Sequence, residues 1–106
     1  MADWRALRVE GLGPVSREVA VFQVGPPLAR LPFASFKVKI IERDNQSFLA
    51  IPNVARRLPD GSPDWTAGLG NSIDEALEDA LRYFAESIGD GSDSLEDYEW
   101  AAVEDF

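Results

Sequence analysis

Carboxylate pairs are the groups in this 106-residue chain that could carry out acid–base catalysis, because the sequence contains no His and no Cys. Two nearby carboxylates can serve as general acid and general base. Asp60 and Asp64 are the candidate pair. Asp beside Gly61 and Pro63 is also typical of turns, in which its side chain bonds the local backbone. We interpret both aspartates as turn formers and predict no catalytic residue.

Neither nucleophilic nor metal-dependent chemistry has a supporting residue pattern. A Ser or Thr nucleophile would need a basic partner, and the two lysines, Lys37 and Lys39, lie on one side of an expected strand. The acids within residues 90–97 lack the alternate-position ligands and the central Gly of a calcium-binding loop. We therefore expect no metal and no cofactor.

Basic residues that could bind phosphate gather in the middle of the sequence. Arg56 and Arg57 are adjacent, and Lys37, Lys39 and Arg43 precede them. Binding to nucleic acid requires a basic surface that neutralises phosphates, whereas this chain has a net charge of −9. We expect solvated basic side chains here and no direct contact with nucleic acid.

Charge is distributed unevenly along the chain. Residues 71–106 carry twelve acids and Arg82 as their single base, a net charge of −11, whereas residues 1–70 carry +2. Such a stretch is commonly a solvated surface, and it can alternatively attract a basic partner protein. Trp and Tyr within it are typical anchors of protein interfaces. The predicted partner-binding residues are Glu78, Asp79, Glu86, Tyr98, Glu99, Trp100 and Phe106.

An amphipathic segment between Gly70 and Gly89 provides the element that would position these acids. Ser72 is a favoured N-cap, and Glu75 three residues later completes a capping box. Gly89 supplies a left-handed C-terminal stop. The pattern predicts one helix whose apolar stripe needs a sheet to cover. The stripe consists of Ile73, Ala76, Leu77, Ala80, Leu81, Phe84 and Ile88.

Two segments before the helix have the pattern of a β-hairpin. Phe36–Ile41 alternates apolar residues with two lysines, which predicts a half-buried strand. Ser47–Ile51 fits the partner strand, and Pro52 and Asn53 are expected to end it.

The remaining segments are predicted with less regular patterns. Residues 53–64 are expected to form a long loop, followed by a third strand at Trp65–Leu69 with Trp65 in the core. Near the amino terminus we expect a strand at residues 4–10 on a sheet edge and a second at residues 15–24 inside a sheet.

These elements predict an α+β fold. We expect an antiparallel sheet of three to five strands, to which Val19–Val24 adds, with one long helix on one face and an acidic carboxyl-terminal tail. The predicted organisation is an accessory segment at 1–32, a β-β-β-α core at 33–89 and an acidic aromatic tail at 90–106. One folded domain fits the length of the chain.

The conformation of the tail is left open by its sequence. Residues 95–106 could form a short helix capped by Ser94, or they could lie extended. In either form, Trp100 and Phe106 could anchor a partner or fold back on the protein's own sheet.

The sequence also bears on location. No apolar run approaches the roughly 20 residues needed to span a bilayer, and the first residues lack the basic start of a signal peptide. The absence of Cys is compatible with a reducing compartment. We expect a cytoplasmic protein without a membrane partner.

The order of strand, turn, strand, Pro-Asn stop, third strand and the helix start Gly70–Leu77 resembles the HicB-type antitoxin domain. The signature of that family is a Gly-polar-Thr/Ser-apolar-acidic-Glu-Ala-Leu helix start, and the resemblance covers about Phe36 to Ile88. It implies a partial double-stranded-RNA-binding-like fold, and it implies that the domain binds and covers a small basic RNA-cleaving toxin.

The chain departs from that family in three places. The loop at residues 53–64 is longer, an amino-terminal segment precedes the domain, and the remainder after the helix is too short and too acidic for the operator-binding domain of the family. We therefore expect no DNA-binding appendage.

Together, these patterns predict a non-catalytic protein-binding module whose acidic surface binds a basic partner, such as a small RNA-cleaving toxin. One alternative is a small adaptor or regulatory protein without a toxin, and another is a carboxylate-dependent enzyme. Unpaired sheet edges could also join copies of the chain into a homo-oligomer.

Overall fold

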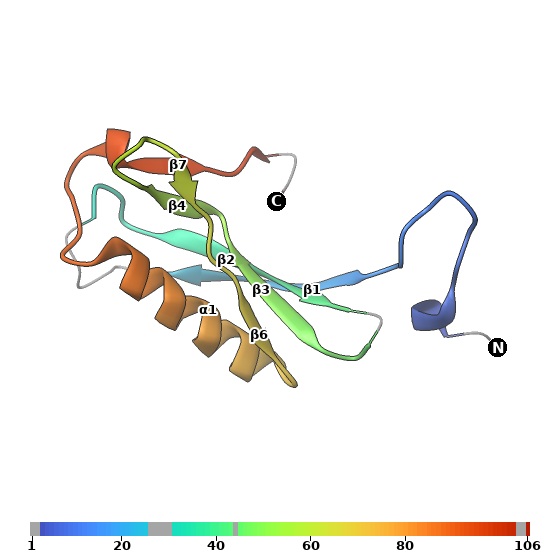
Figure 1. Ribbon diagram of the computed structural model, residues 1–106. Coiled ribbons are helices and arrows are strands. Elements are labelled where there is room, and N and C mark those ends of the chain that lie inside the picture. Colours follow the sequence, from blue (N-terminus) through green and yellow to red (C-terminus); the bar gives the residue numbers. More distant parts are fainter. Residues whose placement is uncertain (1–2, 26–30, 44, 104–105) are drawn as a thin grey trace.

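The computed structural model describes residues 3–25, 31–43, 45–103 and 106 (Figure 1). It confirms the predicted α+β fold, with an antiparallel four-stranded sheet in the order β1-β2-β3-β6 and an antiparallel three-stranded sheet in the order β5-β4-β7. In chain order the elements are η1 (Trp4–Ala6), β1 (Arg17–Val24), β2 (Phe36–Glu42), β3 (Phe48–Pro52), β4 (Val54–Arg57), β5 (Pro63–Asp64), β6 (Gly68–Gly70), α1 (Ile73–Ile88), η2 (Leu95–Asp97) and β7 (Tyr98–Trp100).

Helix α1 begins and ends where its sequence predicts. The Ser72 hydroxyl accepts a hydrogen bond from the Glu75 amide at 3.1 Å, and the Glu75 carboxylate accepts one from the Asn71 amide at 2.9 Å. Gly89 closes the helix with a φ of 54°. None of the helices in the described residues is long and apolar enough to cross a membrane.

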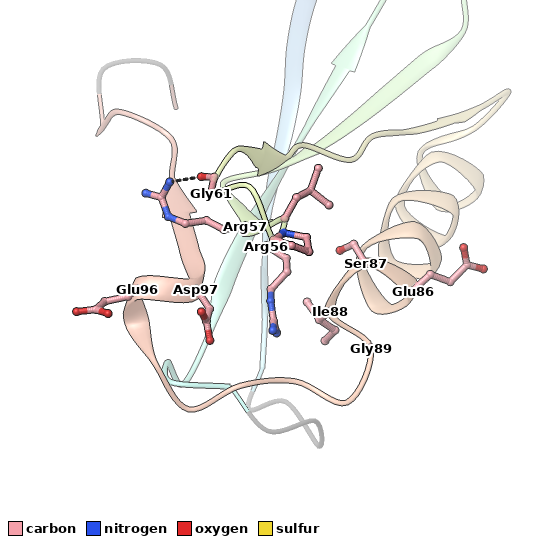
Figure 2. Close-up of a pocket in the computed structure, with 11 residues that line it drawn as sticks. Arg56, Arg57, Gly61, Glu86, Ser87, Ile88, Gly89, Glu96 and Asp97 are labelled. Carbon is pink, nitrogen blue, oxygen red and sulfur yellow. Dashed lines mark hydrogen bonds between the residues drawn. The ribbon is translucent and has the colours of Figure 1, made fainter.

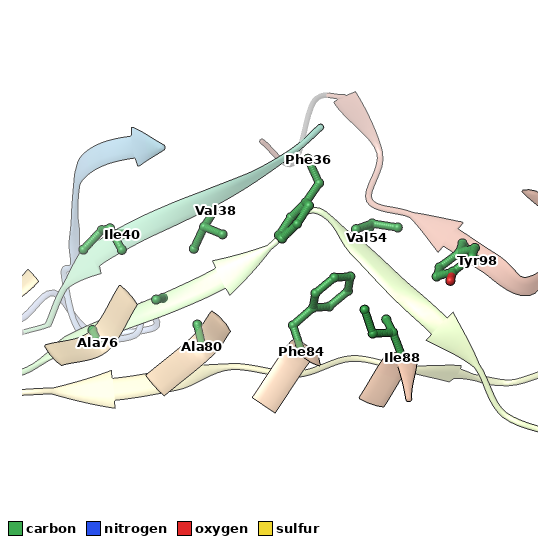
Figure 3. Packing of buried hydrophobic residues seen from close by; sticks show 10 residues of the cluster. Phe36, Val38, Ile40, Val54, Ala76, Ala80, Phe84, Ile88 and Tyr98 are labelled. Atoms are coloured by element: carbon green, nitrogen blue, oxygen red, sulfur yellow. The ribbon is translucent and has the colours of Figure 1, made fainter. Parts of the chain in front are cut away.

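The core lies between α1 and one face of the four-stranded sheet (Figure 3). The predicted alternation of β2 is confirmed, because Phe36, Val38 and Ile40 are all buried. The Phe36 and Phe84 rings pack with their centroids 4.6 Å apart. The buried cluster consists of Phe36, Val38, Ile40, Ala50, Val54, Ala76, Ala80, Phe84, Ile88 and Tyr98.

Strand β6 lies so close to α1 that its glycines have no room for a side chain. A Cβ atom on Gly68 would lie 2.2 Å from the backbone nitrogen of Ala80. At Gly70 the corresponding distance to the backbone nitrogen of Ala76 is 2.5 Å. The small residues of the helix stripe thus allow direct contact between the backbones of α1 and β6.

Strand β3 ends at Pro52, as predicted, and Asn53 then directs the chain from the four-stranded sheet to the three-stranded one. Its amide donates to the Lys37 carbonyl at 2.9 Å, and its side-chain oxygen accepts from the Lys37 amide at 2.9 Å. Its carbonyl accepts from the Ala101 amide at 2.8 Å. Asn53, which lies between β3 and β4, therefore bonds to β2 in the first sheet and to the residue that follows β7 in the second.

The prediction of a long loop at residues 53–64 is wrong, because most of this segment forms a β-hairpin. β4 begins directly after Asn53 and pairs with β5 through Arg56 and Arg57. Val54 and Ala55 are buried, so this segment contributes to the protein interior. The hydrogen bonds of Asn53 allow a strand of the second sheet to begin directly after the end of β3, where a loop was expected.

The amino-terminal predictions are partly confirmed. β1 adds Val19–Val24 to the sheet as predicted, but it lies at an edge and not inside. The prediction of a strand at residues 4–10 is wrong. Residues 4–6 form a 3₁₀ turn capped by Asp3, and residues 7–10 pair with no described strand.

The third strand is shorter than predicted. Only Gly68–Gly70 pairs with β3, and Trp65 precedes the strand. The expectation of a buried Trp65 is also wrong, because its side chain is 46% exposed.

Both alternatives for residues 95–106 are partly correct. The short turn η2 is followed by β7, which pairs with β4 through Tyr98, Glu99 and Trp100. The segment after α1 therefore returns to the body of the protein and completes the second sheet (Figure 1).

Candidate protein-binding surfaces

The outward side of α1 and the turn after it form what we call the acidic surface. All of its members have exposed side chains, and Figure 1 shows α1 lying on the outside of the sheet. The acidic surface consists of Asp74, Glu78, Glu86, Asp90 and Glu96.

The predicted site residues on α1 differ in their surroundings. Glu78 forms an exposed ion pair with Arg82 at 2.8 Å. Asp79 is half-buried, and its carboxylate accepts a hydrogen bond from the Leu69 amide at 3.0 Å, which fixes α1 to β6. Asp79 therefore has a structural contact, while Glu78 and Glu86 point their charge toward solvent.

A hollow of about 580 Å³ lies where the end of α1 faces β4 and η2 (Figure 2). Glu86 and Glu96 lie on either side of it, and the Arg56 side chain extends between Asp97 and Ile88 (Figure 2). The hollow brings two predicted groups of residues, the acids of α1 and the base-rich β4, to one place.

The arginines of β4 are bonded within the protein. Arg56 donates to the Tyr98 hydroxyl at 3.3 Å, and its guanidinium lies 5.4 Å from the centre of that ring. Arg57 donates to the Gly61 carbonyl at 3.0 Å and pairs with Glu99 at 3.3 Å. Both residues therefore help to hold β7 or the β4–β5 hairpin in place.

Tyr98 is not an exposed anchor, which corrects the prediction made for it. Its side chain is only 3% exposed, and its ring meets Phe33 edge-on with centroids 5.3 Å apart. The Tyr98 position in β7 faces the core because β7 pairs with the buried strand β4. Glu99 lies on the other side of β7 and is half-buried.

Trp100 and Phe106 fold back on the protein and yet stay partly accessible. The Trp100 ring packs edge-on against Phe33 at 5.0 Å and is 40% exposed. The Lys39 ammonium lies 4.7 Å from the centre of the Phe106 ring, so Phe106 rests over β2. Both alternatives considered for these residues are thus compatible with the fold.

These two aromatic residues belong to what we call the open face, the surface of the four-stranded sheet opposite α1. Its sheet residues follow from the strand register, in which Val21, Lys39 and Ile51 form one row across β1, β2 and β3. A hollow of about 500 Å³ runs over this face. Its lining includes Lys39, Ile51, Trp65, Trp100 and Phe106.

Sequence reasoning did not identify the open face, although a signal for it exists. β3 carries apolar residues at successive positions, Leu49, Ala50 and Ile51, so both of its faces are apolar. Trp65, which precedes β6, also lines the hollow over this face.

The candidate acid–base pair is organised as a turn. The Asp60 carboxylate accepts hydrogen bonds from the Ser62 hydroxyl at 2.6 Å and the Ser62 amide at 3.0 Å. These bonds lower the pKa of Asp60 from its ordinary value. Asp64 lies in β5 opposite Arg56, which fits the interpretation of both residues as parts of the hairpin.

A buried charge on β2 was not anticipated from the sequence. Glu42 is buried at the far end of the sheet, where it forms ion pairs with Arg5 and with Arg17, the latter at 2.7 Å. The hydrogen bond from Arg5, and then that from Arg17, lowers the pKa of Glu42 despite its burial. This cluster attaches the amino-terminal segment to the sheet.

Comparisons with protein-family models, curated proteins and solved structures found no significant match to this chain. Among the described residues, no group of three or more His, Cys, Asp or Glu side chains is arranged to hold a metal ion.

Proposed function

We propose that the chain is a cytoplasmic, non-catalytic protein-binding module that binds a basic partner protein through its acidic surface. The observation that supports this most is the charge of α1, which presents Asp74, Glu78 and Glu86 on its exposed side and Arg82 as its single base. Complementary charge accelerates encounter and excludes unsuitable partners.

The hollow beside the end of α1 extends the proposed binding area beyond the helix. Glu86 and Glu96 lie on its rim, so a basic side chain of a partner could contact both elements. Nucleic acid is a poor fit to the exposed side of α1, because its carboxylates would repel phosphates.

The resemblance to HicB-type antitoxin domains suggests the class of partner. A small RNA-cleaving toxin has a positive surface for its substrate, and an acidic helix could cover that surface in place of the phosphate backbone. The chain would then act as an antitoxin.

The proposal is tested by capture of partners from a lysate of the source cell on immobilised protein. We expect a small basic protein that is released by salt, because exposed charges are screened within about 10 Å at 0.1 M ionic strength. The double variant Glu78→Gln/Glu86→Gln should weaken the binding by about tenfold or more.

A matched control is the double variant Glu10→Gln/Glu18→Gln, which changes the net charge equally at exposed residues away from α1. It should retain the captured protein. Equal loss in both variants, or capture that is insensitive to salt, would contradict binding through the acidic surface.

The alternative is an adaptor without a toxin. Expression of the captured protein alone separates the two functions. Growth arrest that is relieved by coexpression of this chain supports the antitoxin, whereas a harmless partner supports the adaptor.

A further inference from the structure

Strand β1 lies at an edge of the four-stranded sheet, with β2 on one side. Within the described part of the chain no strand pairs with its other side, so outward N–H and C=O groups of β1 lack a strand partner. The bulge of β1 lies between Glu18 and Ala20, and the pairing with β2 is regular from Ala20 to Val24. β1 therefore offers a regular edge that a further strand could extend.

Beyond its bulge between Glu18 and Ala20, this edge lacks the usual protection against strand addition. Natural edge strands are commonly short or carry lysines and prolines. Residues 19–24 contain neither charge nor Pro, and Val21 is 45% exposed. The opposite edge, β6, is protected by its length of three residues. β1 is thus the edge more suited to pairing.

The apolar side chains of β1 are only partly covered on the α1 side, where Val19, Ala20 and Val24 pack against the core while Phe22 stays more exposed. Phe22 pairs with the buried Val38 in the strand register and therefore points to the α1 side, yet Phe22 is exposed. Helix α1 packs mainly on β6, β3 and β2, and does not shield this edge. The radius of gyration, 15.5 Å, exceeds the roughly 13 Å of a compact chain of this length, as expected for an elongated molecule.

The distribution of charge favours a second copy as the occupant of this edge. The acidic surface belongs to α1, which lies toward β6, whereas β1 and β2 carry Arg17, Lys37 and Lys39 against Glu18 and Glu42. Two copies joined at β1 would hold their acidic helices toward the outer edges of the joined sheet. An antiparallel pair of identical strands is also self-complementary, as a twofold axis requires.

We propose that β1 strands of two copies pair in antiparallel orientation about a twofold axis, which joins the two four-stranded sheets into one continuous sheet. A pair centred on residues 20–24 places Phe22 of each copy opposite its equivalent on the α1 side. On the open face it places Val21 of one copy opposite Gln23 of the other. This interface is separate from the acidic surface and leaves that surface accessible.

The double variant Val21→Glu/Gln23→Glu tests this register. Within one chain the new carboxylates lie opposite Lys39 and Lys37, so the fold of the monomer should be retained. Across the twofold axis the same carboxylates face each other and repel. Light scattering after size-exclusion chromatography should give twice the 11.7 kDa of the chain for the unmodified protein. The variant should raise the dissociation constant of the dimer by about tenfold or more.

A charge-matched control is Leu69→Glu/Leu95→Glu, which changes two exposed residues away from β1 and should leave the dimer intact. The variant Val21→Lys/Gln23→Lys places its new lysines opposite Lys39 and Lys37 of the same chain, so its fold is first checked by circular dichroism. Mixing this folded variant with the Glu variant should restore dimers as a mixed species, because opposite charges then face each other across the twofold axis.

Three results would overturn the proposal. The first is a protein that stays at the mass of one chain up to about 500 μM, well above typical concentrations for specific dimers. The second is equal loss of the dimer in the control, which would indicate association through the open face. The third is folded Glu and Lys variants that fail to form the mixed dimer.

Discussion

The two faces of the four-stranded sheet are built from the same strands, yet they differ in what packs against them. On the covered face, Ala76 and Ala80 of α1 approach the glycines of β6 closely enough to exclude any side chain. On the open face, lysines and partly exposed aromatic residues lie side by side, as at Lys39 and Phe106. The covered face therefore supplies stability through close packing.

The open face instead keeps apolar surface accessible at a cost to solubility. Trp65 and Trp100 line its hollow, and neither is fully covered by the rest of the described chain. Exposed aromatic side chains that lie together commonly mark interaction surfaces. The comparison predicts that substitutions on the covered face reduce stability, whereas those on the open face affect association.

The largest effect is expected for Gly68→Val on the covered face. Val suits a strand, but its Cβ would lie 2.2 Å from the Ala80 backbone nitrogen and would push α1 away. We expect a loss of about 4 kcal/mol or more in the free energy of unfolding. Chemical denaturation measures this loss.

The adjacent residue provides the control for that substitution. Leu69→Val changes the open face of the same strand, at a side chain that is 54% exposed. Its expected cost is about 0.5 kcal/mol. Similar losses for both variants would show that the two faces do not differ in packing.

A smaller effect, about 3 kcal/mol, is expected for Tyr98→Ala, because this substitution leaves a cavity beside Phe33 in the core. Trp100→Ala, two residues further along β7, should cost about 1 kcal/mol because its ring is partly solvated. Thermal unfolding of both variants checks the comparison. A larger loss of stability for Trp100→Ala than for Tyr98→Ala would contradict the assignment of Tyr98 to the core and of Trp100 to a partly solvated surface.

The helix and its sheet could be predicted because their signals are local. The Ser72 hydroxyl caps the Glu75 amide three residues later, as the sequence predicts, while the Glu75 carboxylate bonds the Asn71 amide, one residue before the amide of Ser72 that a capping box would use. The alternation of β2 likewise indicates which side chains face α1. Each of these predictions needed only neighbours in the chain.

The second sheet could not be predicted, since its determinants are distant in sequence. Asn53 continues the chain into β4 only because Lys37 and Ala101 supply its hydrogen-bond partners. Tyr98 is buried for the same reason, because β7 finds its place against β4. Local composition favours a loop at residues 53–64 and leaves residues 95–106 open between helix and extended chain, and tertiary pairing decides both.

The capping of α1 gives a third prediction, of about 1 kcal/mol. Ser72→Ala removes the acceptor for the Glu75 amide and should loosen the helix that covers the sheet. Ser94→Ala is a matched control, because Ser94 occupies the corresponding position before η2 but makes no capping bond with its side chain. Urea unfolding should distinguish the two, and equal losses would exclude the capping bond as the cause.

The smallest effect on stability is expected at Glu42, at the far end of the covered face. There the side chains of Arg5 and Arg17, and not α1, pack over the sheet. Because the bonds from Arg5 and then Arg17 lower the pKa of Glu42 below its ordinary 4.5, the carboxylate stabilises the folded state while it is ionised. This contribution is complete above the pKa of the unfolded chain and is lost as the pH falls through the lower pKa of the folded state. The stability difference between Glu42→Gln and the unmodified protein should therefore be largest at neutral pH and should shrink as the pH falls below the ordinary carboxyl range. A difference that stays constant over this range in urea unfolding would show that packing of the side chain, and not its charge, holds the amino-terminal segment on the sheet.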